Sequence, residues 1–260
     1  MPFTPSHAVV ALPFVRTRLV PAAIAAGAMC PDLPLFVRGT GLGYGLTHDL
    51  RWLPLTVLVA LGMLLVWRCA LRPVATELTP AWVACRLPAV WTRGARAALT
   101  ETFPRAWGSR ILLVISLVLG IASHVVWDAF THEGRLGVQL LPVLAEQWGP
   151  LPGYRWLQHG TGIVALVILG VWGTRWLRHR RPRALGRRVA GWVRIVWWVS
   201  LPLVLACALV WASLVAGPDA GVGTVEQLAY LVLPPATALW LAATVVLSVV
   251  LQARPQRGAA

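Results

Sequence analysis

Long apolar runs separated by arginine-rich segments are the main pattern along this chain. We predict membrane-spanning helices where these runs approach the roughly 20 residues that a helix needs to cross the hydrocarbon core of a bilayer. The expected spans cover about residues 51–71, 110–131, 157–177, 194–216 and 226–251. Because a chain inside lipid must satisfy its own backbone polar groups, the pattern predicts an all-α, polytopic helical membrane protein.

Two shorter apolar segments precede the first span, at about residues 5–15 and 19–30. Neither is long enough to cross a bilayer alone. We therefore expect a short or re-entrant helical hairpin that turns near Arg16–Arg18. Such a hairpin returns His7 and Asp32 to the same side of the membrane.

The chain is expected to form one integral-membrane domain over residues 1–260. Residues 1–50 would hold the hairpin and a motif-bearing loop, residues 51–177 the spans with the polar motifs, and residues 178–260 scaffold spans. The Arg- and Trp-rich segment 72–109 is expected to lie at the membrane interface and to extend its arginine side chains to lipid headgroups.

Composition supports the membrane prediction. Of the 260 residues, 58% are hydrophobic and only 12% are charged, against roughly 25% charged residues in soluble domains. The net charge of +14 comes from 23 arginines, with no lysine, set against 9 acidic residues. These arginines stand in blocks between apolar runs, as in the cytoplasmic loops of membrane proteins, and we expect no nucleic-acid partner.

The arginine blocks also predict the orientation of the chain. The Arg-rich loops 72–109 and 178–194 should be cytoplasmic, whereas the connections 132–156 and 217–225 should face outward. We therefore expect a multi-pass protein of the plasma or inner membrane, with the lipid bilayer as its main partner.

Histidines and aspartates gather at the outer end of this arrangement. His124, Asp128 and His132 share one face of the second span, because residues four and eight apart lie on one side of a helix. His48 begins the first span. The N-terminal hairpin brings His7 and Asp32 to the same depth in the membrane. Ionisable groups at membrane depth are costly, so this convergence points to a functional site.

Imidazole and carboxylate groups are ligands of zinc and of other divalent metals in hydrolytic sites. We predict a metal site, with zinc as the first choice, in which His124 and Asp128 form the central pair. A free carboxylate, Asp49 or Glu133, would act as the general base. The candidate metal ligands are His7, Asp32, His48, His124, Asp128 and His132.

Each candidate also fits a purely structural role, and the sequence leaves these alternatives open. Asp32 follows a proline and fits a helix stop or cap. Asp49 fits a favourable interaction with the dipole of the first span. His124 and Asp128 fit a buried hydrogen bond that holds two helices together, and His7 lies where a helix start needs only a cap.

Five motifs resemble an actinobacterial multi-pass membrane family that is known as a domain of unknown function. They are Met1-Pro2-Phe3-Thr4-Pro5-Ser6-His7-Ala8, Gly27-Ala28-Met29-Cys30-Pro31-Asp32-Leu33-Pro34, Thr47-His48-Asp49-Leu50, His124-Val125-Val126-Trp127-Asp128-Ala129-Phe130-Thr131-His132 and Trp156-Leu157-Gln158-His159-Gly160. The resemblance covers the whole chain and is sharpest over residues 1–160.

More distantly, the order His, Pro-Asp, Thr-His and His-x-x-x-Asp resembles the inner-membrane metal-dependent hydrolases. Those proteins often carry a further histidine after Pro-Asp and a serine after Thr-His, where this chain has Leu33-Pro34 and Asp49. The resemblance implies metal-dependent hydrolysis, and the departures imply that one ligand of that family's site is missing here.

Two classes of function remain open on these grounds. The first is a metal-dependent hydrolase acting on a lipid-linked or phosphate ester substrate. The second is a non-enzymatic protein, either a metal or proton carrier, a structural component or a family member that has lost catalysis. The inner halves of the expected spans hold almost no ionisable residues, which disfavours a path through the membrane.

Overall fold

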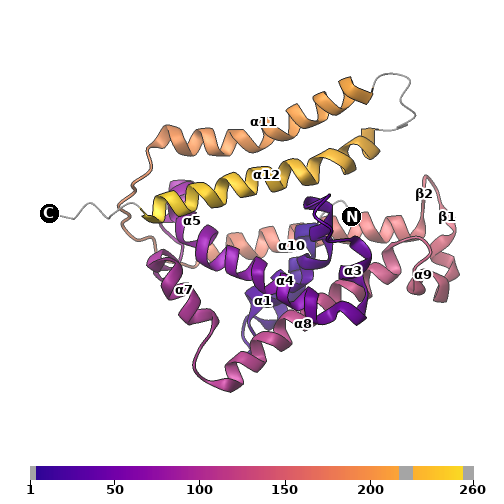
Figure 1. Ribbon diagram of the computed structural model, residues 1–260, viewed down its shortest axis with the longest axis horizontal. Helices are drawn as coiled ribbons and strands as arrows, with labels where there is room; N and C mark the ends of the chain where they lie inside the picture. Colours follow the sequence, from indigo (N-terminus) through magenta and orange to yellow (C-terminus); the bar gives the residue numbers. More distant parts are fainter. Residues whose placement is uncertain (1–3, 217–224, 254–260) are drawn as a thin grey trace. The chain divides into compact units, whose positions relative to one another are not determined.

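The computed structural model describes residues 4–216 and 225–253 (Figure 1). Contacts in space between residues divide the chain into two compact units. The first comprises Met1–Pro34, Leu42–Leu64 and Phe103–Trp176, and the second Leu35–Gly41, Leu65–Thr102 and Leu177–Ala260. Our expectation of a single integral-membrane domain stays a prediction.

The described residues are almost entirely helical, which confirms the predicted all-α class. In chain order the helices are η1 (Thr4–Phe14), α1 (Pro21–Met29), η2 (Cys30–Asp32), α2 (Leu33–Phe36), α3 (Tyr44–His48), η3 (Leu50–Trp52), α4 (Leu53–Leu65), η4 (Val66–Leu71), α5 (Arg72–Leu78), α6 (Ala81–Ala84), η5 (Ala89–Arg93), α7 (Gly94–Thr102), α8 (Trp107–Thr131), α9 (Leu136–Leu140), η6 (Pro142–Ala145), α10 (Gly153–Arg178), α11 (Gly191–Ala216) and α12 (Val225–Ala253). The short strands β1 (Gln147–Trp148) and β2 (Leu151–Pro152) form an antiparallel hairpin before α10.

Five helical segments are long and apolar enough to cross a membrane, as the sequence predicted. They are Leu50–Leu78, Trp107–Thr131, Gly153–Arg178, Gly191–Val215 and Gln227–Ala253. The first is longer than expected, because the helix continues through the π-helical turn η4 into α5. The outward connection expected at 217–225 falls almost wholly on residues 217–224, outside the described part of the chain.

The predicted N-terminal hairpin is present in the first unit. Helix η1 packs against α1, and the chain reverses between them near Arg16–Arg18. Helix α1 consists largely of alanine and glycine and packs along α8. A Cβ added at Gly27 would overlap the Leu117 carbonyl oxygen, and one added at Gly120 would overlap the Ile24 carbonyl oxygen. Small residues thus let the two backbones touch, as is common between membrane helices.

One face of α8 is buried from Leu113 to the end of the helix. Ser116, Gly120, His124 and Asp128 recur every four residues and therefore share that face. The Ser116 hydroxyl accepts a hydrogen bond from the Val20 backbone N–H (2.9 Å) at the start of α1. The tight packing of α1 on α8 carries the end of α1, and with it Asp32, alongside the polar half of α8.

The second unit contains α5 to α7 and the helix pair α11 and α12, which pack against each other. The Trp197 and Trp240 rings lie 4.7 Å apart between this pair. Arg68 and Arg72 are buried in this unit, and Arg72 Nη2 lies 2.7 Å from Glu101 Oε2. For these two arginines the expected contact with lipid headgroups is replaced by hydrogen bonds inside the protein, because a nearby carboxylate compensates the buried charge.

Candidate metal centre

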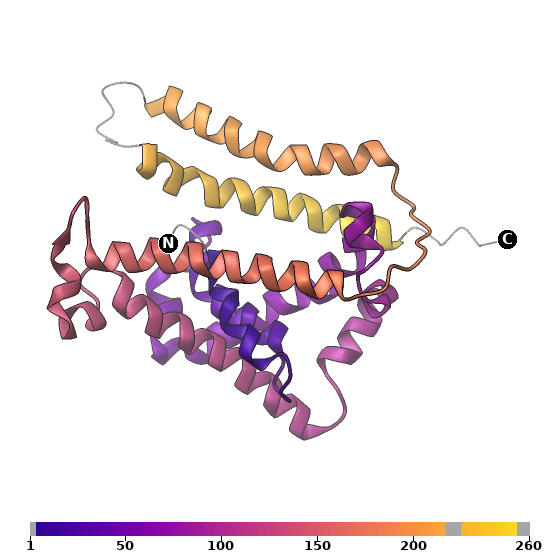
Figure 2. The same ribbon diagram turned by 180° about the vertical axis from the view of Figure 1, so that it is seen from behind.

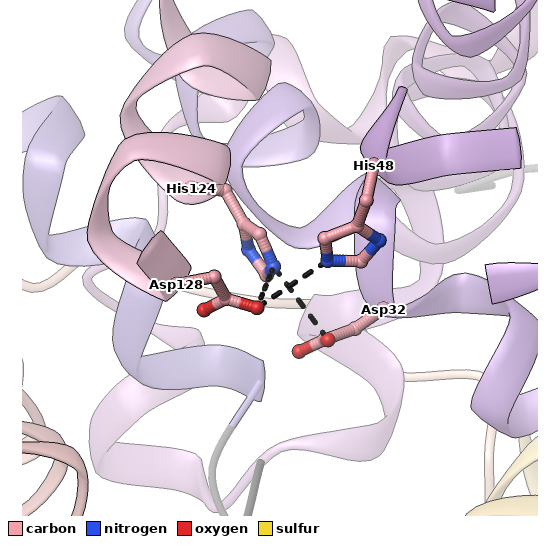
Figure 3. A group of neighbouring side chains, drawn as sticks. All are labelled: Asp32, His48, His124 and Asp128. Carbon is pink, nitrogen blue, oxygen red and sulfur yellow. Dashed lines mark hydrogen bonds and ion pairs between the residues drawn. The ribbon is translucent and has the colours of Figure 1, made fainter. Parts of the chain in front are cut away.

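Four side chains from three separate segments converge in the first unit (Figure 3). Asp32, His48, His124 and Asp128 each offer one ligand atom, and these four atoms all lie within 4.8 Å of one another. All four residues are buried, with His124 and Asp32 fully inaccessible to solvent. Four of the six sequence-predicted ligands therefore form one compact group.

Local structure explains how each side chain reaches this point. His124 and Asp128 lie one turn apart on α8. Asp32 follows Pro31 in η2, which continues directly from α1. His48 ends the short helix α3, and the Thr47 hydroxyl beside it donates a hydrogen bond to the Pro31 carbonyl oxygen (2.7 Å), which ties the loop to the Pro-Asp turn.

Three of the separations between the ligand atoms are close to those around a small divalent ion. Asp128 Oδ2 lies 3.3 Å from His48 Nε2 and 3.4 Å from His124 Nε2, and Asp32 Oδ1 lies 3.6 Å from His124 Nε2. Ligands at roughly 2.0–2.1 Å from a tetrahedral zinc ion are about 3.3–3.4 Å from one another. The residues present therefore fit a zinc-sized cation by type and by spacing.

The hydrogen bonds of His124 determine which of its nitrogens carries the proton. Nδ1 lies 2.7 Å from the Ala28 carbonyl oxygen, which only accepts hydrogen bonds, so Nδ1 must be the donor. In the neutral ring Nε2 then carries a lone pair, and this atom faces the oxygens of Asp32 and Asp128. A lone pair opposite two carboxylates is repulsive unless a cation lies between them or Nε2 is itself protonated.

His48 has the same arrangement. Its Nδ1 lies 3.0 Å from the Tyr44 carbonyl oxygen, so in the neutral ring Nε2 again faces Asp128 with a lone pair. A histidine whose outer nitrogen donates to a backbone carbonyl and whose inner nitrogen is free is typical of metal ligands.

Both carboxylates are also oriented by hydroxyl groups. Thr4 donates a hydrogen bond to Asp32 Oδ2 (2.8 Å), and the Tyr44 hydroxyl donates one to Asp128 Oδ2 (3.1 Å). Asp32 Oδ1, Asp128 Oδ1 and His124 Nε2 are buried without a hydrogen-bond partner. Buried polar atoms are rarely left unpaired. Asp32 Oδ1 and His124 Nε2 face each other at 3.6 Å, so these two atoms mark a position where a ligand is expected, whereas Asp128 faces the histidines with Oδ2 (Figure 3).

With neutral imidazoles, the two aspartates leave this buried group with a charge of −2. A divalent cation neutralises that charge. Protonation of both histidines would also neutralise it, which is the structural alternative to a metal. Metal content distinguishes the two.

The other two predicted ligands lie beside the group of four rather than within it. The His7 ring packs on the His124 ring with centroids 4.1 Å apart. His132 Nδ1 lies 3.6 Å from Asp128 Oδ2, and its Nε2 accepts a hydrogen bond from the Gln158 amide (3.1 Å). Burial lowers the pKa of His132. Both histidines are thus placed to support the ligands.

The two carboxylates predicted as general base lie outside the group of four. Asp49 Oδ2 is paired with Arg51 Nη2 at 2.6 Å, and the Arg51 hydrogen bonds lower the pKa of Asp49. Glu133 accepts a hydrogen bond from the Tyr154 hydroxyl (3.3 Å).

Two supporting residues were missed by the sequence reasoning. Tyr44 stacks on the His48 ring (3.8 Å between centroids) in addition to binding Asp128. Its position four residues before His48 on one helix was the available signal, since i and i+4 share a face. Thr4 is the second, and no local pattern in the sequence connects it with Asp32.

Comparison with known proteins identifies the family but no function. The family model described as "Domain of unknown function (DUF4184)" matches residues 1–251, so the chain belongs to this family. Searches of curated proteins and of solved structures found no match. The function therefore has to be argued from the site.

Proposed function

We propose that this member of the DUF4184 family is a membrane-embedded, metal-dependent hydrolase. The observation that carries the proposal is the pair of histidines whose Nε2 atoms face two buried aspartates. This donor set suits zinc. Manganese and iron accept the same ligand types, so the site could also bind either of them.

In the proposed site, Asp32, His48, His124 and Asp128 hold the metal. A bound divalent cation polarises a carbonyl or phosphoryl oxygen and lowers the pKa of water to near 7. The backbone carbonyls of Ala28 and Tyr44 hold the two imidazoles in the ligating tautomer. His7 and His132 support the ligands, or hold a second ion.

Of the two proposed general bases, Glu133 is the better candidate. Asp49 is held by Arg51, and its lowered pKa makes it a weaker proton acceptor. Glu133 directly follows His132, whose ring is 3.6 Å from an oxygen of Asp128. A small movement of the exposed Glu133 side chain would bring its carboxylate towards the site.

The proposed location is the outer half of the membrane. It is supported by the arginine-rich loops 72–109 and 178–194, which the positive-inside rule assigns to the cytoplasm. A site at this depth meets lipids first, and we therefore propose a lipid-linked or phosphate ester substrate.

Metal analysis of the detergent-purified protein tests the proposal. We expect a stoichiometric divalent metal in the native protein and its loss in His124→Ala and Asp128→Ala. His159→Ala is the matched control, because His159 lies on α10 outside the group of four. Absence of metal, or equal metal in all variants, would show that the buried group is a protonated ion-pair network instead. Metal flux into liposomes would favour a carrier.

A further inference from the structure

A cavity of about 590 Å³ lies beside the metal centre in the first unit. Its walls come from η1, α8 and α10. In Figure 2, α10 is the salmon helix that passes in front of the indigo N-terminal hairpin. The volume is within the range of roughly 300–1,000 Å³ that is usual for pockets that bind small molecules.

The cavity adjoins the proposed ligands through its own wall. His7 lines the cavity, and its ring packs on the His124 ring at 4.1 Å. His7 Nε2 is buried and has no hydrogen-bond partner. Whatever fills the cavity therefore lies one side chain away from the metal centre.

Polar and apolar residues both line the cavity. Gln158 and Thr131 line it where α8 ends and α10 begins, next to His132. Farther along α10 the lining residues are apolar, with Val164, Ala165 and Ile168, although Ser123 of α8 also lines the cavity. This polarity suits an amphiphile with its polar group near the histidines.

The length of the whole lining along α10 is close to the thickness of one bilayer leaflet. On α10 the lining extends from Gln158 to Ile168, which corresponds to about 15 Å at a rise of 1.5 Å per residue. The hydrocarbon core of a bilayer is about 30 Å thick, so this distance is about half of it.

The cavity is open on the α10 side. Val164 and Ile168 line it, yet 57% and 45% of their surfaces remain exposed. Helix α10 is also one of the segments apolar enough to span a membrane. Exposed apolar residues at this depth contact hydrocarbon, so the opening leads into the bilayer and not into water.

We propose that this cavity seats the alkyl chain of a membrane lipid whose phosphate ester group lies at His7, beside the candidate metal centre. The assignment of this lipid as the substrate rests on the proposed hydrolase function. The seat itself depends only on the cavity, and it should bind an alkyl chain without metal.

Photolabelling tests the seat directly. The full chain is reconstituted in phosphatidylcholine vesicles with dodecyl phosphate that carries a diazirine on its alkyl chain, and labelled residues are mapped by mass spectrometry. We expect labels on the lining positions of η1 and α10, with competition by unlabelled dodecyl phosphate and none by inorganic phosphate. Labels spread evenly over the exposed faces of α11 and α12, without enrichment at the cavity, would overturn the proposal.

Filling the cavity provides the matched comparison. Ala165→Phe should lower labelling about tenfold, roughly the effect of displacing two methylene groups. Val167→Phe is the control, because Val167 lies on the same helix, is exposed and does not line the cavity. Val10→Phe closes the cavity from η1 and should act like Ala165→Phe.

Metal content of the same preparations separates the two proposals. Native metal content in Ala165→Phe and Val10→Phe shows that these variants fold. If the variants fold and are labelled like the native protein, the cavity does not bind the alkyl chain, whereas the proposed metal centre is unaffected. If labelling is specific to the cavity but no metal is found, the cavity binds an alkyl chain and the hydrolase proposal fails.

Discussion

The contact between Gly27 and Gly120 should control the affinity of the metal centre from a distance. A Cβ on Gly120 would lie 2.7 Å from the Ala28 nitrogen and would overlap the Ile24 carbonyl oxygen. Neither obstacle is a flexible side chain, so in Gly120→Ala the backbones of α1 and α8 must move apart by roughly 1 Å, at a cost of about 1–3 kcal/mol.

This separation reaches the site because the ligands lie on both sides of the contact. Asp32 continues from α1, whereas His124 belongs to α8 one turn beyond Gly120. Asp32 Oδ1 and His124 Nε2 are now 3.6 Å apart. An extra displacement of roughly 1 Å exceeds the tolerance of about 0.2 Å in metal–ligand bonds, so we expect a loss of about 10–100-fold in zinc affinity, as for disturbed supporting residues.

Competition with a zinc chelator in detergent measures this loss. Gly170→Ala on α10 is the matched control, because a Cβ there meets no atom within 4 Å. Gly27→Ala should mimic Gly120→Ala, and the double variant should lose less than the sum, since both act on one contact. Native zinc affinity in Gly120→Ala would refute the argument that this helix contact sets the ligand geometry.

Three further predictions concern single side chains. Tyr44→Phe keeps the ring on His48 but removes the hydroxyl from Asp128, so zinc affinity should fall by about tenfold in the same chelator assay. Glu133→Gln should lower phosphate ester hydrolysis by about 10²–10⁴-fold if Glu133 is the base, with metal content retained, whereas Asp49→Asn should change it little. Glu101→Gln leaves the buried Arg72 without a charged partner. It should therefore lower the free energy of unfolding by about 1–3 kcal/mol and with it the melting temperature. Because the Arg72 hydrogen bonds lower the pKa of Glu101 from 4.5, the native form should lose this stabilisation as the pH falls below about 4.5, and pH-insensitive melting in that range would contradict it.

Membrane architecture was the most predictable property of this chain. The five apolar runs alone predicted five spans, and the structure has a suitable helix at each. The N-terminal hairpin was predictable for the same reason, because its two segments are too short to cross. What the apolar pattern missed is the continuation of the first span to Leu78, which includes Arg72, buried and compensated by Glu101.

The residues of the candidate site were predictable by type, but their grouping was not. Spacing along α8 predicted that His124 and Asp128 share a face. No spacing in the sequence distinguishes Asp32 and His48, which join them, from His7 and His132, which lie beside them. That distinction depends on differences of a few ångströms in how three segments meet.

The sequence by itself determined that this protein is helical and membrane-bound, and which residues were chemically capable of binding a metal. These properties follow from residue type and periodicity, which act locally. Only the tertiary structure decided which candidate ligands lie together, the hydrogen-bond partner of His124 Nδ1 and the position of the cavity, because each depends on groups that are distant along the chain. The Ala28 carbonyl that orients His124 lies 96 residues before it. The contact of Gly27 on α1 with α8 brings the Ala28 carbonyl to His124. The same contact places Asp32 opposite the His124 ring.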